Sequence, residues 1–487
     1  MSEEIKNLEP KAIWENFYLL TQVPRPSNHE EKARVAVMNW AKEHNLNAIQ
    51  DEVGNIIIKK PATPGMENRM GCILQGHLDM VPQKNNDTVH DFENDPIDAY
   101  VEGEWVTARG TTLGADNGMG VAAGMAILTS TDIPHGPIEV LITATEETGM
   151  DGAEGLKAGM LDGDILLNLD SEDEGELYVG CAGGIDGNFA FNYKEEAIPA
   201  GMKALSLTLK GLKGGHSGMD IILGRGNSNK LLFRFMKDAH KEFGMRLASI
   251  NGGSLRNAIP RESFATVLVP EGAMCEFTAK VKEYENTYKA ELSAVEPTLE
   301  FTAESCDMPT SVIEEKIQIN LTHAILACPN GVERMSDAMP GLVETSNNLA
   351  FVESKDGLIT INCLLRSSVE TAKMGLVQSM TSVFELAQAN SIEFNGEYPG
   401  WKPNMASPIL KAMQETYNKM YGKTPEIKAI HAGLECGLLG SVYPNWDMIS
   451  FGPTIRSPHS PDERVKIDTV VLFWDFLKET LKNVPTK

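Results

Sequence analysis

Short apolar runs, each interrupted by few polar residues, alternate with helical patterns in the first third of the chain. Four of these runs are predicted to be strands: 55–59, 71–75, 138–144 and 165–169. A strand that is apolar on both faces has to be covered on both faces, which is typical of a sheet between layers of helices. The first third of the chain is therefore predicted to form an α/β domain.

Two helices that would cover this sheet are predicted from local signals. Ser27 and Glu30 form a capping-box pattern, which predicts a helix that begins near them. A second helix, rich in small residues, is expected from Gly118 to about Leu128.

From about residue 187 to residue 400 the pattern changes. Polar and apolar residues alternate at 205–210, 264–269 and 358–364, as they do in strands with one exposed face. Amphipathic helices are expected around these strands, near 230–243, 276–294, 312–327 and 372–389. This order predicts an inserted α+β region with an antiparallel sheet, made of one or two units.

After residue 400 the alternation of helices and strands resumes. The expected elements are a helix at 409–421, strands at 427–431 and 448–451, and a last helix from Pro461. A chain of 487 residues is too long for one ordinary core, so two or three domains are expected. We place the junctions near 187 and 400, so that 1–187 and 401–487 form one discontinuous domain around the insert 188–400.

The composition argues against several classes of protein. No stretch of about 18 or more apolar residues could span a bilayer, and the acidic start lacks the features of a secretory signal. The seven cysteines are scattered and never spaced as C-x-x-C, which disfavours a disulfide framework or a thiolate zinc site and fits the cytoplasm. A net charge of −25 disfavours nucleic acid or an anionic membrane as a partner, because phosphate binding needs a basic face.

Side chains that could bind metal follow several of the predicted strands. His77 and Asp79 end the run CILQGHLDMVP and, being two residues apart, project to the same side of a strand. Further acidic or imidazole residues stand at other strand ends or turns: Asp116, Glu146, Glu147, Asp170 and His459. Taken alone, each is equally well explained as a helix cap, a turn residue or a solvated strand end.

Taken together, these residues favour a metal site. Ligands of an open parallel sheet bind at the carboxyl ends of its strands, where these groups lie. Two histidines and at least four carboxylates carry more negative charge than one cation needs, but they fit two divalent metals that share a carboxylate. The adjacent Glu146 and Glu147 can then have different roles, one binding metal and the other transferring protons.

Eight motifs along the chain resemble those of the co-catalytic zinc metallopeptidases, a family that includes carboxypeptidase and aminoacylase relatives as well as dipeptidases. The motifs are HLDMVP, TTLGADNG, TATEETGMDGAEG, NLDSEDEGE, GLKGGHSG, NGGSLRNAIPRE, HAGLECG and GPTIRSPHSPDE. The resemblance covers essentially the whole chain. It implies a zinc-peptidase catalytic domain with a mixed, largely parallel sheet flanked by helices, and an inserted α+β lid or dimerisation domain.

The resemblance also implies a role for each residue at the strand ends. The two zinc sites would share one ligand and consist of His77, Asp116 and Asp170, and of Asp116, Glu147 and His459. Asp79 would orient His77, and Glu146 would act as the general base towards a water held by the metals. The peptide bond after Asp116 would be cis.

In the insert, the resemblance implies that His216, Asn257 and Arg366 bind substrate, with Arg366 suited to a free C-terminal carboxylate. His216 could serve its own chain or the second subunit of a homodimer. The expected activity is hydrolysis of unblocked dipeptides, including Xaa-His dipeptides such as carnosine, by a cytoplasmic enzyme with two zinc ions that cobalt or manganese could replace. A deacylase of N-acyl amino acids and a non-catalytic metal-binding relative are the alternatives.

Overall fold

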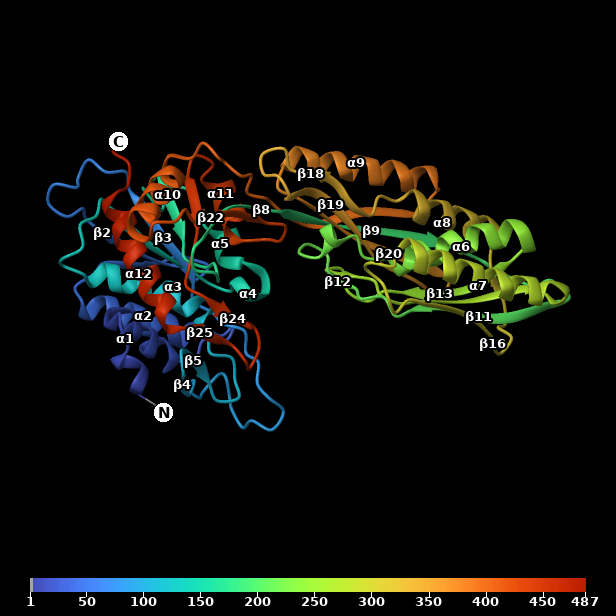
Figure 1. The fold of residues 1–487 in the computed structure, drawn as a ribbon, viewed down its shortest axis with the longest axis horizontal. Helices are drawn as coiled ribbons and strands as arrows, with labels where there is room; N and C mark the ends of the chain where they lie inside the picture. The colour runs from blue at the N-terminus through green and yellow to red at the C-terminus, as the bar shows by residue number, and fades with distance from the viewer. Residues whose placement is uncertain (1–2) are drawn as a thin grey trace. The chain divides into compact units, whose positions relative to one another are not determined.

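The computed structural model describes residues 3–487, which fold into two compact units (Figure 1). The first unit consists of the chain up to Gly180, Pro403–Ala429 and Leu434–Lys487, and the second consists of Cys181–Lys402 and Ile430–Gly433. The second unit therefore begins at Cys181, where the sequence suggested residue 188. It is a single unit and not two.

An eight-stranded sheet forms the centre of the first unit. Its strands are, in order, β1 (Ala48–Gln50), β2 (Ile56–Lys60), β6 (Ile138–Thr143), β3 (Cys72–His77), β7 (Ile165–Asn168), β23 (Asp447–Ser450), β8 (Glu176–Cys181) and β22 (Glu426–Ile430). The central strands β6, β3, β7 and β23 are parallel, whereas β1, β2 and β8 pair antiparallel with their neighbours. All residues of β3 and β6 are buried, which confirms the mixed α/β sheet predicted from the apolar runs.

Helices flank this sheet. They are α1 (Lys11–Thr21), α2 (Glu31–Glu43), α3 (Ala115–Thr129), α4 (Glu146–Gly149), α5 (Asp151–Gly155), α10 (Pro408–Tyr421), α11 (Glu435–Val442) and α12 (Ile467–Lys482). Helix α3 packs on β3 and β6, and α10 packs on β23 and α12. Among the helices of residues 3–487, none has the length and apolar character that a membrane span requires.

A smaller, four-stranded sheet joins the C-terminal segment to the chain before α3. Its order is β24 (Ile455–Arg456), β25 (Arg464–Lys466), β5 (Trp105–Ala108) and β4 (Ala99–Glu102), and all pairs are antiparallel. The loop between β24 and β25 carries His459, and the chain that leaves β5 leads to Asp116. The pairing of β25 with β5 therefore brings these two segments together.

One predicted helix cap and one predicted helix start are wrong. Helix α2 begins at Glu31 without a side-chain cap, because Ser27 donates to Asp79 and Glu30 accepts a hydrogen bond from Thr145. The last helix begins at Ile467 and not at Pro461, because the residues between them join the four-stranded sheet as β25. In both places a tertiary contact outweighs a local signal.

The second unit is built on a nine-stranded sheet, as its alternating patterns predicted. The main order is β16 (Glu300–Ser305), β11 (Met202–Lys210), β15 (Ser263–Pro270), β13 (Arg246–Gly252), β19 (Val343–Lys355), β20 (Leu358–Ser367), β9 (Gly183–Asn192) and β21 (Ser391–Tyr398), and β18 (Gly331–Met335) pairs with β19. All of these pairs are antiparallel.

Four helices lie along this sheet (Figure 1): α6 (Ser228–Phe243), α7 (Met274–Glu291), α8 (Glu315–Ala327) and α9 (Glu370–Leu386). One hydrophobic core, to which Phe189, Leu207, Phe235 and Phe384 belong, fills the space between the helices and the sheet. Two short pairs complete the unit, β10 (Glu195–Glu196) with β17 (Val312–Ile313) and β12 (Gly215–His216) with β14 (Ala258–Ile259).

Candidate functional site

The carboxyl ends of β3, β6 and β7 meet at one edge of the sheet in the first unit. His77 is the last residue of β3, Glu146 and Glu147 begin α4 shortly after β6, and Asp170 follows β7. Because these strands are parallel neighbours, their ends lie side by side and bring the four side chains to one place.

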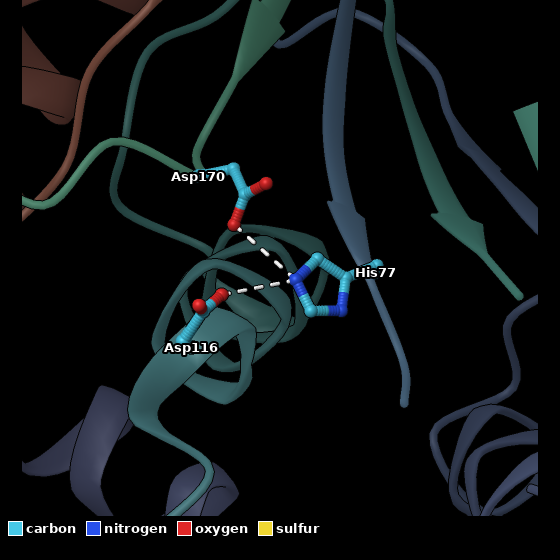
Figure 2. Close-up of side chains that lie close together, drawn as sticks. All are labelled: His77, Asp116 and Asp170. Carbon is cyan, nitrogen blue, oxygen red and sulfur yellow. Dashed lines mark hydrogen bonds and ion pairs between the residues drawn. The ribbon is translucent and has the colours of Figure 1, made fainter. Parts of the chain in front are cut away.

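Asp116 lies between the two histidines. Its Oδ1 is 3.0 Å from Nε2 of His77, and its Oδ2 is 3.4 Å from Nε2 of His459. Figure 2 shows Asp116 and Asp170 pointing at the same ring nitrogen of His77, with Asp170 Oδ1 at 3.4 Å. Nε2 of His459 also lies 2.9 Å from Oε2 of Glu147. Each histidine therefore faces a different oxygen of Asp116, as expected if that carboxylate bridges two metals.

Asp79 is buried and holds the groups around it in place. Its Oδ1 lies 3.3 Å from Nδ1 of His77. The backbone N–H groups of Glu146 and Glu147 donate to its two oxygens at 2.9 and 3.2 Å, and Oγ of Ser27 donates at 2.7 Å. Burial disfavours the charge, but hydrogen bonds and the charge of His77 outweigh it and lower the pKa of Asp79 to about 2. Asp79 is thus an ionised acceptor that orients His77 and the start of α4.

Carboxylates raise the pKa of both histidines. Hydrogen bonds to Asp116 and Glu147 raise the pKa of His459 to about 11. Burial alone would lower the pKa of His77, but Asp170 and Asp116 outweigh it, so that this pKa lies well above its usual value. Both imidazoles are therefore in the positively charged, doubly protonated form at neutral pH, and a metal ion that bound to Nε2 would have to displace a proton.

Burial also raises the pKa of several carboxyl groups. It raises the pKa of Asp170 to about 7 and that of Glu146 well above its usual value, in each case against the positive charge of His77. It likewise raises the pKa of Glu172 to about 8 and that of Glu435 to about 7. So many buried carboxylates can ionise together only beside additional positive charge.

Three overlapping groups of side chains offer ligand atoms within 4.8 Å of one another. They are His77, Asp116 and Asp170; His77, Glu146 and Glu147; and Asp116, Glu147 and His459. Among the described residues, Oε1 of Glu147 and Oδ1 of Asp170 are buried without a hydrogen-bond partner. Imidazole nitrogens together with buried carboxylate oxygens that accept no hydrogen bond fit a divalent metal such as zinc. The first and third groups coincide with the ligand sets that the motifs implied, and the peptide after Asp116 is cis.

The predicted substrate residues lie in the second unit. His216 ends β12, and the N–H of the following Ser217 donates to the carbonyl of Asn257 at 2.8 Å. Arg366, on β20, is buried and donates to the hydroxyl of Tyr398 at 2.9 Å and to that of Ser217 at 3.4 Å. The hydrogen bonds of Arg366 are thus made to neutral hydroxyl groups, and its guanidinium shares a neighbourhood with the chain segments of His216 and Asn257.

Four residues near the candidate metal ligands were missed by the sequence prediction. Ser27 binds Asp79, Glu435 accepts hydrogen bonds from side chains on β3 and β6, and Arg25 and Glu463 bind the backbone of the ligand loops. Glu435 and Glu463 stand inside the motifs HAGLECG and GPTIRSPHSPDE, which was the available signal. Arg25 and Ser27 lie outside every motif.

Comparison with known proteins agrees with this geometry. The chain matches the profile of peptidase family M20/M25/M40 over residues 73–483. It is 49% identical over 484 residues to the cytosol non-specific dipeptidase of Escherichia coli (strain K12), which covers 99% of this chain and 100% of that protein.

Solved structures agree as well. The aminoacylhistidine dipeptidase from Vibrio alginolyticus is 51% identical, with a TM-score of 0.96 over 100% of this chain and 99% of that one. A tripeptidase from Staphylococcus aureus shares the fold, with a TM-score of 0.56 at 16% identity over 98% of this chain and 99% of that one. The family resemblance noted in the motifs is thereby confirmed, and the chain belongs to peptidase family M20/M25/M40.

Proposed function

We propose that the chain is a metallo-dipeptidase with two zinc ions per subunit, which cobalt or manganese can replace. The ligand sets are His77, Asp116 and Asp170 for one ion, and Asp116, Glu147 and His459 for the other. The observation that carries this proposal is the position of Asp116, whose two oxygens face the Nε2 atoms of two different histidines. The names of the relatives from E. coli and V. alginolyticus support dipeptides as the substrates and the cytoplasm as the location.

Glu146 is proposed to move the protons of the reaction. Zinc ions bound at these positions would acidify a water molecule and polarise the scissile carbonyl. Glu146 would accept the proton of that water and later deliver it to the leaving amine. Burial supports this role, because it raises the pKa of Glu146 and so makes its carboxylate a stronger base than an exposed one. The hydrogen bond from its backbone N–H to Asp79 fixes where the side chain begins.

Arg366 is proposed to bind the free carboxylate of the substrate. Its guanidinium is buried among neutral hydroxyl groups, so an incoming carboxylate would supply the counter-charge through two parallel hydrogen bonds. This requirement would favour substrates with a free C-terminus. Asn257, which lies beside the His216 segment, is proposed to contact the substrate as well.

His216 is proposed to stabilise the oxyanion that forms at the scissile carbonyl. Its Nδ1 accepts hydrogen bonds at 3.1 Å from the N–H groups of both Gly218 and Met219, so the proton of the neutral ring is on Nε2. Burial and the charge of Arg366 lower the pKa of His216, which keeps the ring neutral. An Nε2–H held in this way is a fixed donor for an oxyanion.

Paired assays test the substrate class. Zinc-loaded protein would be given a panel of dipeptides, including Xaa-His dipeptides such as carnosine, and the N-acetyl form of each one. The proposal expects hydrolysis of the unblocked forms at much higher kcat/KM. Preference for the N-acetyl forms would instead identify a deacylase, and failure to hydrolyse either form with two zinc ions bound would identify a non-catalytic relative.

A further inference from the structure

Glu463 binds the loop that carries the bridging aspartate entirely through the backbone. The side chain is 2% exposed, and each of its oxygens accepts two backbone hydrogen bonds. Oε2 accepts from the N–H groups of Leu113 (2.8 Å) and Gly114 (2.9 Å), and Oε1 from those of Ala115 (2.7 Å) and Asp116 (3.2 Å). Four consecutive N–H groups, the last of which belongs to Asp116, are therefore held by one carboxylate.

Arg25 binds the same loop from the other side. It is also 2% exposed, and its Nη2 donates to the carbonyl of Gly114 at 2.5 Å. Its Nη1 donates to the carbonyls of Leu78 (2.8 Å) and Asp79 (3.2 Å), which directly follow His77. A buried cation thus joins the loop after β3 to the loop before α3, and Gly114 is held by Arg25 at its C=O and by Glu463 at its N–H.

The segment of Glu463 carries a metal ligand of its own. His459 lies four residues earlier in the same loop between β24 and β25. The carbonyl of Glu463 accepts a hydrogen bond from Oγ1 of Thr107 on β5 at 2.8 Å, which secures this segment beside the chain that leads to Asp116. Three separate parts of the chain, carrying His77, Asp116 and His459, are therefore connected through two buried side chains.

Gly114 is the residue that this arrangement requires. Its φ of +71° lies in the left-handed region, and a Cβ there would be 2.6 Å from Nη2 of Arg25 and 2.8 Å from Sδ of Met80. The loop can approach the guanidinium this closely because it has no side chain at this point.

We propose that Arg25 and Glu463 are positioning residues, which hold the loops of His77, Asp116 and His459 at the separation that two metal ions need. This inference rests on the proposed function, because it presupposes the two metal sites. Buried charges are costly unless they are hydrogen-bonded. Here the hydrogen bonds of Nη1 and Nη2 of Arg25 and of both oxygens of Glu463 go to the backbone of the ligand loops, so these side chains serve to fix those loops. Neither residue contacts substrate or metal in this role.

The test is zinc affinity, measured by titration of the metal-free protein against a chelator of known affinity. Glu463→Gln keeps the shape of the side chain but turns an NH2 group towards two of the four N–H donors. Because Asp116 is a proposed ligand of both ions, we expect zinc affinity to fall by about 10–100-fold, the usual effect of residues that orient ligands. The kcat measured at limiting zinc should fall with KM unchanged, and it should recover as free zinc is raised.

Glu296→Gln is the matched control. Glu296 is 0% exposed and accepts backbone hydrogen bonds from Lys213 (2.7 Å) and Gly226 (2.9 Å), but it belongs to the second unit, whereas all the proposed metal ligands belong to the first. Replacing the carboxylate of Glu296 by an amide should lower the melting temperature and leave the affinities of both zinc sites unchanged. An equal loss of zinc affinity in the two variants would show that Glu463 acts through general stability, which would overturn the inference.

Arg25→Lys provides a second variant that would decide the matter if Glu463→Gln did not fold. A lysine keeps the charge but lacks the planar fork that reaches three carbonyl oxygens. The same selective weakening of zinc binding is expected, and wild-type affinity at both sites in a folded variant would overturn the inference. Failure of the wild-type protein to bind two zinc ions would instead overturn the proposed function, and this inference with it.

Discussion

Replacing Glu146 by glutamine should separate catalysis from metal binding. Glu146 is the proposed base, but it also belongs to a candidate ligand group with His77 and Glu147. Glutamine keeps the length of the side chain and the backbone N–H that donates to Asp79, and it removes the charge that accepts a proton. We therefore expect Glu146→Gln to bind two zinc ions and to have a greatly reduced kcat.

The expected loss of kcat follows from the proposed role of Glu146 as general base. General-base catalysis contributes about 10²–10⁴-fold, which corresponds to about 3–5 kcal/mol of activation free energy. The neighbouring Glu147→Gln is the matched comparison, because Oε2 of Glu147 lies 2.9 Å from Nε2 of His459 within a proposed ligand set. Residues that only orient a ligand change metal affinity by about 10–100-fold. Loss of Glu147, a proposed ligand itself, should weaken one zinc site by at least about 100-fold.

Both variants would be dialysed against the same free zinc, and zinc content and steady-state kinetics would be measured on the same samples. Two zinc ions with a kcat reduced by at least about 100-fold are expected for Glu146→Gln, and close to one zinc ion for Glu147→Gln. A zinc content below two ions in Glu146→Gln would show that Glu146 is a metal ligand. Normal zinc content with near-normal turnover would remove it from the role of base.

Four further predictions test other parts of the site. Zinc binding should release protons and strengthen as the pH rises from about 6 to 8, because the raised pKa of His459 (about 11) keeps its ring protonated in the metal-free protein, while Asp170, with a pKa of about 7, loses its proton within this range. Calorimetry in buffers of different ionisation enthalpy would measure the release, and binding that is independent of pH would contradict it. Arg366→Lys should raise KM for dipeptides about tenfold or more but leave that for dipeptide amides unchanged, and equal effects on acids and amides would remove Arg366 from the carboxylate site. A fragment ending at residue 400 lacks β23 and His459, so it should bind zinc poorly and be inactive, whereas a folded fragment with full activity would refute the discontinuous domain. Mixed His216→Ala and Glu146→Gln proteins should regain activity on subunit exchange if His216 serves a partner subunit, and exchange without recovery would assign His216 to its own chain.

The residues at strand ends could be predicted because one geometric rule places them. His77, Asp170 and the Glu146–Glu147 pair each follow a buried apolar run, and the carboxyl ends of parallel strands necessarily meet. The position of His459 has a different origin. It was expected just before a helix, whereas it lies in a loop whose approach to Asp116 depends on the pairing of β25, a strand of three residues, with β5. Such a strand is too short for any periodicity to predict.

Glu463 shows why the supporting groups of the site were harder to predict than its ligands. Glu463 stands two residues after Pro461, from which the last helix was predicted, and an acidic residue there would be expected to favour the N-terminus of that helix. The chemistry of that expectation holds, since Glu463 does bind the N–H groups at a helix start, but the helix is α3 and the first of those groups lies 350 residues earlier in the chain. Its partners are backbone groups, which nearly every residue possesses, so the contact requires no particular side chain on the other side. The contact restricts the amino-acid type only at Gly114, where the positive φ and the nearby guanidinium of Arg25 exclude a Cβ. A glycine in a turn has many ordinary explanations, and only the folded chain shows which of them applies here.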